Sequence, residues 1–287
     1  MRRYPVFCLV LGLLFGAGRF VFAQADQRII YASVLDKNGA PVTGLGEKDF
    51  IIREDGLARE ILSVVPDQDP LQVALMVDTS GPMRDNVLEL RWALAAFVDN
   101  TRPGVQIELI TLGARPTVRL PYTSDHAALK KSIDSLYVEP GSGNTLLDGI
   151  SEMSVGLERR QNARSVMAAI TGPDDLSYSE SRDVPPAFTA SGAALHVLRL
   201  GPQTTDHLLE MVLSKATSAT GGRNEIVLSP MALPARAAQL AKEISSQYRV
   251  TFARPPRLIP PKKTEISARN PDFTARGMLM KSARERQ

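Results

Sequence analysis

Short apolar runs that end in turn residues dominate the chain between residues 26 and 66. Residues 29–35, 50–53 and 61–65 have the β-branched and apolar character of strands. Asn38-Gly39 and Asp55-Gly56 stand between these runs and supply the positive φ angles that tight turns require. We predict a small antiparallel β unit here, which is too small to be stable unless other strands complete it.

From residue 67 onward the pattern changes to apolar runs that alternate with amphipathic segments. The clearest pair is the run 73–77 and the segment 83–100, in which apolar side chains recur at helical spacing. Further strands are predicted at residues 105–112, 117–120, 166–170 and 195–200, and further helices at residues 126–136, 147–159 and 205–219. Strands separated by helices predict an α/β fold with a doubly wound, mostly parallel sheet flanked by helices.

The last part of the chain returns to strand-like patterns after one more helix. This helix is predicted at residues 233–246, and the strands at residues 248–252, 264–268 and 273–276. These strands have no partner in the central pattern, so we predict that they complete one small antiparallel β annex formed from both termini. The expected parts are a leader (1–25), an N-terminal annex (26–66), a central domain (67–230), a C-terminal helix with the strands that complete the annex (231–280), and a frayed tail (281–287).

The first 25 residues have the pattern of a secretory signal peptide. Arg2 and Arg3 precede a mostly apolar stretch, and small residues follow at Ala23 and Ala25. An uncleaved membrane anchor is the alternative, but Arg19 interrupts the apolar stretch, and a membrane span needs about 20 predominantly apolar residues. We expect cleavage of the leader and export of a mature protein that is not integral to the membrane, either to the periplasm or as a secreted protein.

Charge and cysteine content narrow the function classes. The chain has 34 Lys and Arg against 31 Asp and Glu, and loss of three arginines with the leader leaves 34 − 3 = 31 basic side chains. A nearly neutral mature chain gives no indication of a nucleic-acid partner. Cys8 is the only cysteine and lies in the leader, so we expect neither disulfides nor thiol chemistry in the mature protein.

Oxygen-bearing side chains follow the apolar run 73–77 directly. Asp78 and Ser80 come at its end, and Thr145 lies in a loop rich in glycine and serine before a predicted helix. Ligands of open α/β sheets bind outside the carboxyl ends of the strands, so these residues mark a candidate binding edge. Helix capping is the alternative, because Asp78 and Ser80 can cap the helix that has Pro82 in its first turn, and Thr145 can cap the next one.

These motifs resemble those of the von Willebrand factor type A (VWA) domains, and more closely those of the bacterial secreted proteins described as VWFA-related. The likeness rests on Asp78-x-Ser80 after an apolar strand, Thr145 before a helix, and Ile170-Thr171-Gly172 at a later strand end. It extends into the flanks at residues 34–45, 49–56, 246–248 and 274–277. The resemblance implies a Rossmann-like VWA sheet with a metal-ion-dependent adhesion site (MIDAS), where a partner's carboxylate completes the shell of a divalent cation.

Two positions depart from the family pattern of Asp-x-Ser-x-Ser, a threonine and a later aspartate. Pro82 stands at the second serine, and Gly172 stands at the aspartate. Affinity for Mg²⁺ should fall sharply without that hydroxyl and that anion, because Mg²⁺ requires a near-octahedral set of oxygen ligands. The resemblance thus implies a degenerate site with Asp78, Ser80 and Thr145 as candidate metal ligands, and with Asp174 and Asp175 as further ligand-binding residues that could substitute. No cofactor is certain, and Mg²⁺ or another divalent cation stays open.

Other chemistries find little support in the sequence. His126, His196 and His207 lack metal-ligand spacing, no Gly-x-Ser-x-Gly elbow precedes a helix, and residues 141–145 lack the lysine of a phosphate-binding loop. We interpret the chain as an exported, non-enzymatic adhesion or interaction module that binds an unidentified protein at the carboxyl edge of the sheet. The alternatives are a structural docking component of an envelope assembly with a vestigial metal site, and a hydrolytic enzyme.

Overall fold

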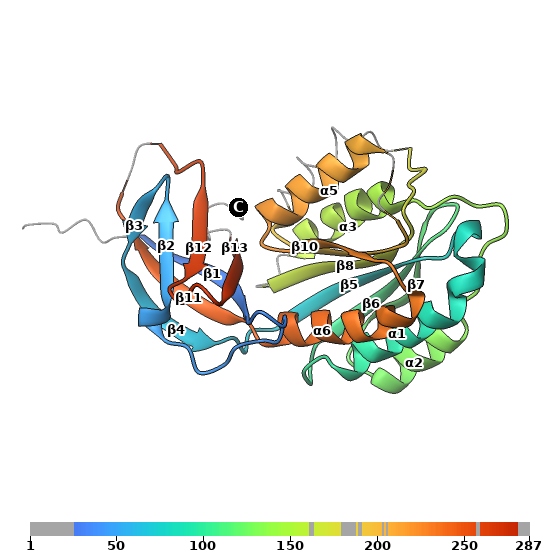
Figure 1. Ribbon diagram of the computed structural model, residues 1–287, viewed down its shortest axis with the longest axis horizontal. Coiled ribbons are helices and arrows are strands. Elements are labelled where there is room, and N and C mark those ends of the chain that lie inside the picture. The colour runs from blue at the N-terminus through green and yellow to red at the C-terminus, as the bar shows by residue number, and fades with distance from the viewer. Residues whose placement is uncertain are drawn as a thin grey trace, which may run out of the picture.

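A six-stranded sheet with helices on both faces forms the larger part of the protein, and two smaller antiparallel sheets lie beside it (Figure 1). The computed structural model describes residues 26–160, 164–178, 188, 191–202, 204, 206–256 and 259–280. The predicted signal peptide (1–25) and tail (281–287) lie outside the described residues.

The central sheet has the strand order β10-β9-β8-β5-β6-β7. Its strands are β5 (Leu71–Asp78), β6 (Gln106–Leu112), β7 (Pro116–Thr123), β8 (Arg164–Thr171), β9 (Ala194–Leu200) and β10 (Arg223–Val227). All neighbours pair in parallel except β7, which is antiparallel to β6. Every residue of β5 from position 73 to 78 is buried, as expected for a parallel strand covered on both faces. The predicted doubly wound, mostly parallel sheet is confirmed.

Helices cover both faces of this sheet. On one face lie α1 (Val87–Asp99), α2 (His126–Asp134) and α6 (Leu233–Ser245), and on the other lie α3 (Leu146–Arg160) and α5 (His207–Ala219) (Figure 1). Short 3-10 helices occur at Glu47–Asp49, Gly81–Asn86 and Pro230–Ala232. The segment predicted as one helix at residues 83–100 begins as the 3-10 helix Gly81–Asn86 and continues as α1. The C-terminal helix α6 packs against α1 on the central sheet and not in the annex.

The annex consists of two antiparallel sheets that share a core. One sheet has the order β13-β1-β11-β4 and the other β12-β2-β3. Their strands are β1 (Asp26–Leu35), β2 (Phe50–Glu54), β3 (Leu57–Arg59), β4 (Ile61–Pro66), β11 (Tyr248–Arg254), β12 (Thr264–Ala268) and β13 (Thr274–Leu279). Phe50 and Ile52 of one sheet and Val250 and Phe252 of the other are buried in this core. The prediction that strands from both termini build one annex is confirmed.

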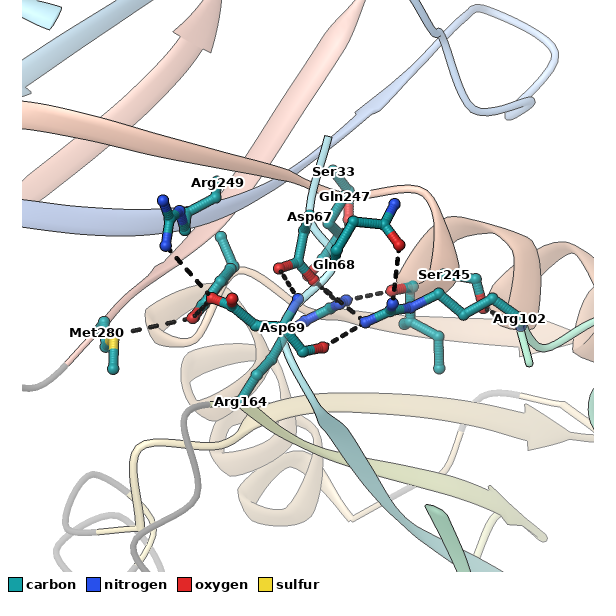
Figure 2. Close-up of polar contacts among 12 residues, drawn as sticks. Ser33, Asp67, Gln68, Asp69, Arg102, Arg164, Ser245, Gln247, Arg249 and Met280 are labelled. Carbon is teal, nitrogen blue, oxygen red and sulfur yellow. Dashed lines mark hydrogen bonds and ion pairs between the residues drawn. The ribbon is translucent and has the colours of Figure 1, made fainter. Parts of the chain in front are cut away.

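The link between the annex and the central domain is held by buried ion pairs (Figure 2). The carboxylate of Asp67 is fully buried, pairs with Arg164 at the start of β8, and lies 3.7 Å from the guanidinium of Arg102. Asp69 accepts a hydrogen bond of 2.7 Å from the hydroxyl of Tyr31 in β1. Because an unpaired buried carboxylate is costly, these pairs fix the link in one position.

A second junction brings two backbone segments into direct contact. Gly221 follows α5 with a φ of +67°, the left-handed conformation common at the end of a helix. A Cβ atom at this position would lie 2.3 Å from the carbonyl carbon of Gly277 in β13. Glycine at position 221 therefore allows the annex strand β13 to approach the turn between α5 and β10.

Candidate functional site

Asp78 ends β5, and its carboxylate joins two neighbouring strand ends. Its Oδ1 accepts a hydrogen bond from the backbone N–H of Ser80 (2.8 Å), and its Oδ2 accepts one from the backbone N–H of Gly172 after β8 (2.9 Å). Burial raises the pKa of Asp78, whereas hydrogen bonds from Ser80, Gly172 and Thr171 act in the opposite direction. Asp78 is only 1% exposed, so this carboxylate holds the loops after β5 and β8 together.

The side chains of Asp78 and Ser80 do not cap the helix that follows β5. Ser80 is the N-cap of the 3-10 helix Gly81–Asn86, but its side chain makes no capping hydrogen bond. The carboxylate of Asp78 is turned toward the backbone of Ser80 and Gly172 instead. Pro82 lies in the first turn of the 3-10 helix, as expected for a residue without a backbone N–H.

The loop before α3 contributes two buried polar residues, Asn144 and Thr145. The hydroxyl of Thr145 donates to the carbonyl of Gly113 (3.2 Å) and therefore does not cap α3. The Nδ2 atom of Asn144 donates to the hydroxyl of Thr171 (2.6 Å) and to the carbonyl of Asp174 (2.7 Å), which ties this loop to the end of β8. The Oδ1 atom of Asn144 is buried and has no hydrogen-bond partner among the described residues.

The N-terminus of α3 is capped by the loop that follows β8. Asp175 Oδ1 accepts a hydrogen bond from the N–H of Leu147 (3.3 Å), and the hydroxyl of Ser177 accepts one from the N–H of Asp148 (3.0 Å). Burial raises the pKa of Asp175, and hydrogen bonds from Ser177 and Leu147 oppose that rise. One oxygen of the Asp175 carboxylate is therefore engaged with the helix.

Most oxygen atoms expected to bind a divalent cation are already engaged within the protein. Both carboxylate oxygens of Asp78 accept backbone hydrogen bonds, and the hydroxyl of Thr145 faces Gly113. At Gly172, the terminal methyl of Met83 lies 2.7 Å from the position of a Cβ atom, where an aspartate side chain would begin. Within the described residues, no group of three or more His, Cys, Asp and Glu side chains is arranged for metal binding. The donor set does not fit an octahedral Mg²⁺ site.

A pocket of about 280 Å³ opens at this edge beside Asp78. Four aspartates line it, namely Asp78, Asp174, Asp175 and Asp206. Asp206 caps α5 by accepting two backbone hydrogen bonds, whereas the exposed carboxylate of Asp174 has no hydrogen bond or ion pair with any described residue. No lysine, arginine or histidine of the described chain lines the pocket, so its character is acidic.

The sequence located the edge but missed part of its lining. The structure places Asp78, Ser80 and Asp174 around one pocket, with Thr145 buried next to it. Asn144 was not predicted as a site residue, although it is a small polar residue in the same loop as Thr145 and could have been identified on that ground. Other lining residues, such as Met83, carry no chemical signal in the sequence and come together only through the fold.

The segment that carries this edge matches a known family. The family model of the von Willebrand factor type A domain matches residues 73–174. This part of the chain has the VWA fold. The match runs from β5 to the loop after β8, and it contains every predicted site residue except Asp175, which follows directly.

Solved structures share this fold at low sequence identity. The von Willebrand factor type A protein from Catenulispora acidiphila has a TM-score of 0.51 and 12% identity, and the match covers 90% of this chain and 72% of that chain. Proximal thread matrix protein 1 from the mussel byssus has a TM-score of 0.53 and 15% identity, with coverage of 67% and 50%. Another structure of that mussel protein has a zinc-occupied MIDAS motif (TM-score 0.49, 16% identity, coverage 67% and 49%), which is a property of that protein. At these identities the likeness shows the fold alone.

No curated protein sequence matches the chain. Among the described residues, none of the helices is both long enough and apolar enough to cross a membrane.

Proposed function

We propose that this VWA domain is a protein-binding module that engages its partner at the carboxyl edge of the central sheet. The observation that carries the proposal is the convergence of separate loops on one pocket, with Asp78, Asn144, Gly172 and Asp206 all in its lining. Ligands of open α/β sheets bind at this edge. The volume of about 280 Å³ lies just below the range of about 300–1,000 Å³ for small-molecule sites, and it suits one or two side chains of a protein.

Two large exposed side chains next to the pocket support a protein partner. Leu176 lines the pocket and is 68% exposed, and Tyr178 is 92% exposed. Aromatic side chains are enriched in protein interfaces, because they combine a large contact area with few rotatable bonds. These residues give a binding partner an apolar surface at the rim of an acidic pocket.

We propose that the module has no enzymatic activity. Ser80 and Ser142 place hydroxyls at the pocket, but no histidine, lysine or cysteine of the described chain lines it. A serine nucleophile needs an adjacent general base. Turnover of ester or peptide substrates that persists through repurification and is lost in Ser80→Ala or Ser142→Ala would overturn this part of the proposal.

We propose further that binding at this edge does not require Mg²⁺, with cation-dependent adhesion as the second candidate because Asp78, Ser80 and Thr145 are retained. Calorimetric titration with Mg²⁺ and Mn²⁺ separates the two. We expect no binding heat from the wild-type protein or from Asp78→Asn, which keeps the size of the side chain. Heat that is present in the wild type and lost in the variant would support the second candidate.

The binding edge can be tested by photo-cross-linking in the native host. A benzophenone amino acid is placed at position 176 or 178, and at position 259 as the control, where Ile259 is 76% exposed in the annex. We expect a discrete protein adduct from the two edge positions and none from position 259. The reverse result would favour the structural alternative, in which the protein docks into an envelope assembly through its annex.

Export is also part of the proposal, since residues 1–25 have the pattern of a signal peptide. Protein recovered from the periplasmic and culture fractions should have an N-terminus at residues 24–26. An intact leader on protein in the cytoplasm would contradict export without affecting the proposed binding edge.

A further inference from the structure

Resting on the proposed binding role of this edge, we propose that the pocket receives a positively charged side chain, lysine or arginine, from the protein partner. This chemistry is the opposite of the carboxylate that the family resemblance implies for a metal-dependent site. Three properties of the pocket lead to this inference: its charge, the unpaired acceptors of its lining residues, and its mixture of apolar and acidic side chains.

The charge of the pocket is negative even after the helix dipoles are counted. Its four aspartates carry four negative charges when ionised. Two of them, Asp175 and Asp206, cap the N-termini of α3 and α5, each of which carries about half a positive charge. An excess of about three negative charges remains, and no basic residue of the described chain lines the pocket to offset it.

Two acceptor groups on residues that line the pocket have no hydrogen-bond donor among the described residues. Asn144 is 4% exposed, and its Oδ1 atom is unpartnered although its Nδ2 atom makes two hydrogen bonds. Rotating the amide group by 180° would turn Oδ1 toward the carbonyl of Asp174, which cannot donate a hydrogen bond, so the acceptor is fixed at this position. The carboxylate of Asp174 is exposed and also unpaired. An ammonium group has three N–H donors and a guanidinium group has five, and neither has an acceptor.

The mixed lining of the pocket suits a long side chain with a charged end. Pro82, Met83, Pro173 and Leu176 contribute apolar surface to the lining. Lysine and arginine bury their methylene stems along such surfaces while the charged end reaches polar groups. The lining of the pocket thus combines apolar and acidic side chains around a volume of about 280 Å³.

Short blocked peptides test this proposal with the intact mature protein. The probes are acetyl-Gly-Ala-X-Ala-Gly-amide with lysine, arginine, norleucine or glutamate at X, titrated at low salt while the backbone amide signals of Gly143 and Gly172 are followed by NMR. Both glycines line the pocket. We expect saturable shifts with the lysine and arginine peptides, and binding at least about fivefold weaker with the norleucine and glutamate peptides. The relative affinities for lysine and arginine then identify the preferred cation.

A matched pair of double variants separates local contacts from net charge. Asp174→Asn/Asp206→Asn should weaken binding of the basic peptides about five- to tenfold, and asparagine at position 206 still caps α5. Asp134→Asn/Asp272→Asn removes the same charge at exposed positions outside the pocket and should leave binding unchanged.

Three results would overturn the inference: equal binding of the norleucine or glutamate peptide, equal losses in both double variants, or no shift at Gly143 and Gly172 with any peptide. If edge cross-links form at position 176 while the basic peptides do not bind, the partner chemistry is wrong and the binding role stands. If neither occurs, both proposals fail.

Discussion

Acidification to pH 5 should weaken the fold through His196, a side chain buried in the middle of β9. His196 is 0% exposed, and neither ring nitrogen has a hydrogen-bond partner among the described residues. Burial lowers its pKa from 6.5 to about 4. Glu243 of α6 opposes this change, and the cations Arg223 of β10, Arg276 of β13 and Arg164 of β8 add to it.

The lowered pKa of His196 means that the unfolded chain binds a proton at pH values where the folded protein does not. Its contribution to stability is therefore complete above pH 6.5, decreases as the pH falls, and is fully lost below about pH 4. One pKa unit corresponds to about 1.4 kcal/mol, so the full loss is about 3 kcal/mol, of which about 2 kcal/mol falls between pH 7.5 and pH 5.

The acidic neighbour Glu243 affects stability in a lower pH range than His196 does. Burial opposes ionisation of Glu243, but His196, Arg276 and Arg223 together lower its pKa below 4.5. A carboxylate with a lowered pKa loses its contribution only as the pH falls from its unfolded pKa through its folded pKa. Asp78 and Asp175, whose pKa values are raised by burial, are present in the wild type and in a His196 variant alike, so the difference between these two proteins reports on the histidine.

Urea unfolding followed by circular dichroism at pH 7.5, 6.5, 5.5 and 5 measures this loss. The wild-type protein should lose about 2 kcal/mol more than His196→Leu, which cannot bind a proton, between pH 7.5 and pH 5. The leucine variant should be at least as stable as the wild type at pH 7.5, because it removes two unpartnered buried nitrogens. His207→Gln, at an exposed position, should follow the wild type. Equal losses in the wild type and His196→Leu would refute the reasoning.

Three further changes test the junctions and the degenerate metal site. Gly221→Ala should destabilise the protein by about 2–4 kcal/mol, because of the left-handed φ and the contact with the annex backbone. Gly104→Ala is the control, with a φ of +82° and open space around it, and should cost only about 1 kcal/mol. The midpoints of urea unfolding compare the stability of the two variants. Asp67→Asn should cost about 3–5 kcal/mol in the same assay, because it leaves a buried arginine unpaired, and a cost below 1 kcal/mol would show that the pair is not structural. The double variant Pro82→Ser/Gly172→Asp should give Mg²⁺ binding heat that the wild type lacks, and no heat from either protein would show that these two positions do not limit affinity.

The elements with strong periodicity were predictable, and those defined by their position in the sheet were not. β5 was found because a strand covered on both faces is a continuous apolar run. β10 was missed because Arg223, Asn224 and Glu225 resemble a loop in sequence; they form the edge of the sheet, where half-buried polar side chains are common. Edge strands depend on pairing with a neighbour, in this case β9, and the local sequence does not encode that partner.

The candidate site shows the same division. The residues that end β5 could be assigned to the binding edge, because strand ends of a parallel sheet share one edge. Their partners could not, since Asn144 bonds to Thr171 and Asp175 caps the helix at Leu147 across separations of 27 and 28 residues. Spacing alone makes Thr145 a reasonable cap for α3, and only tertiary packing directs its hydroxyl to another loop.

The position of β1 imposes an order on assembly. β1 lies between β13 and β11, so Ile30 pairs with both Leu279 and Val250, residues that are synthesised after the whole central domain. The central strands and helices lie within residues 71–245 and can fold as soon as that stretch is available. The annex cannot close until β13 has been synthesised, and pairing across such separations is slow. In an exported chain, β1 emerges before the central domain and pairs only with strands that follow that domain.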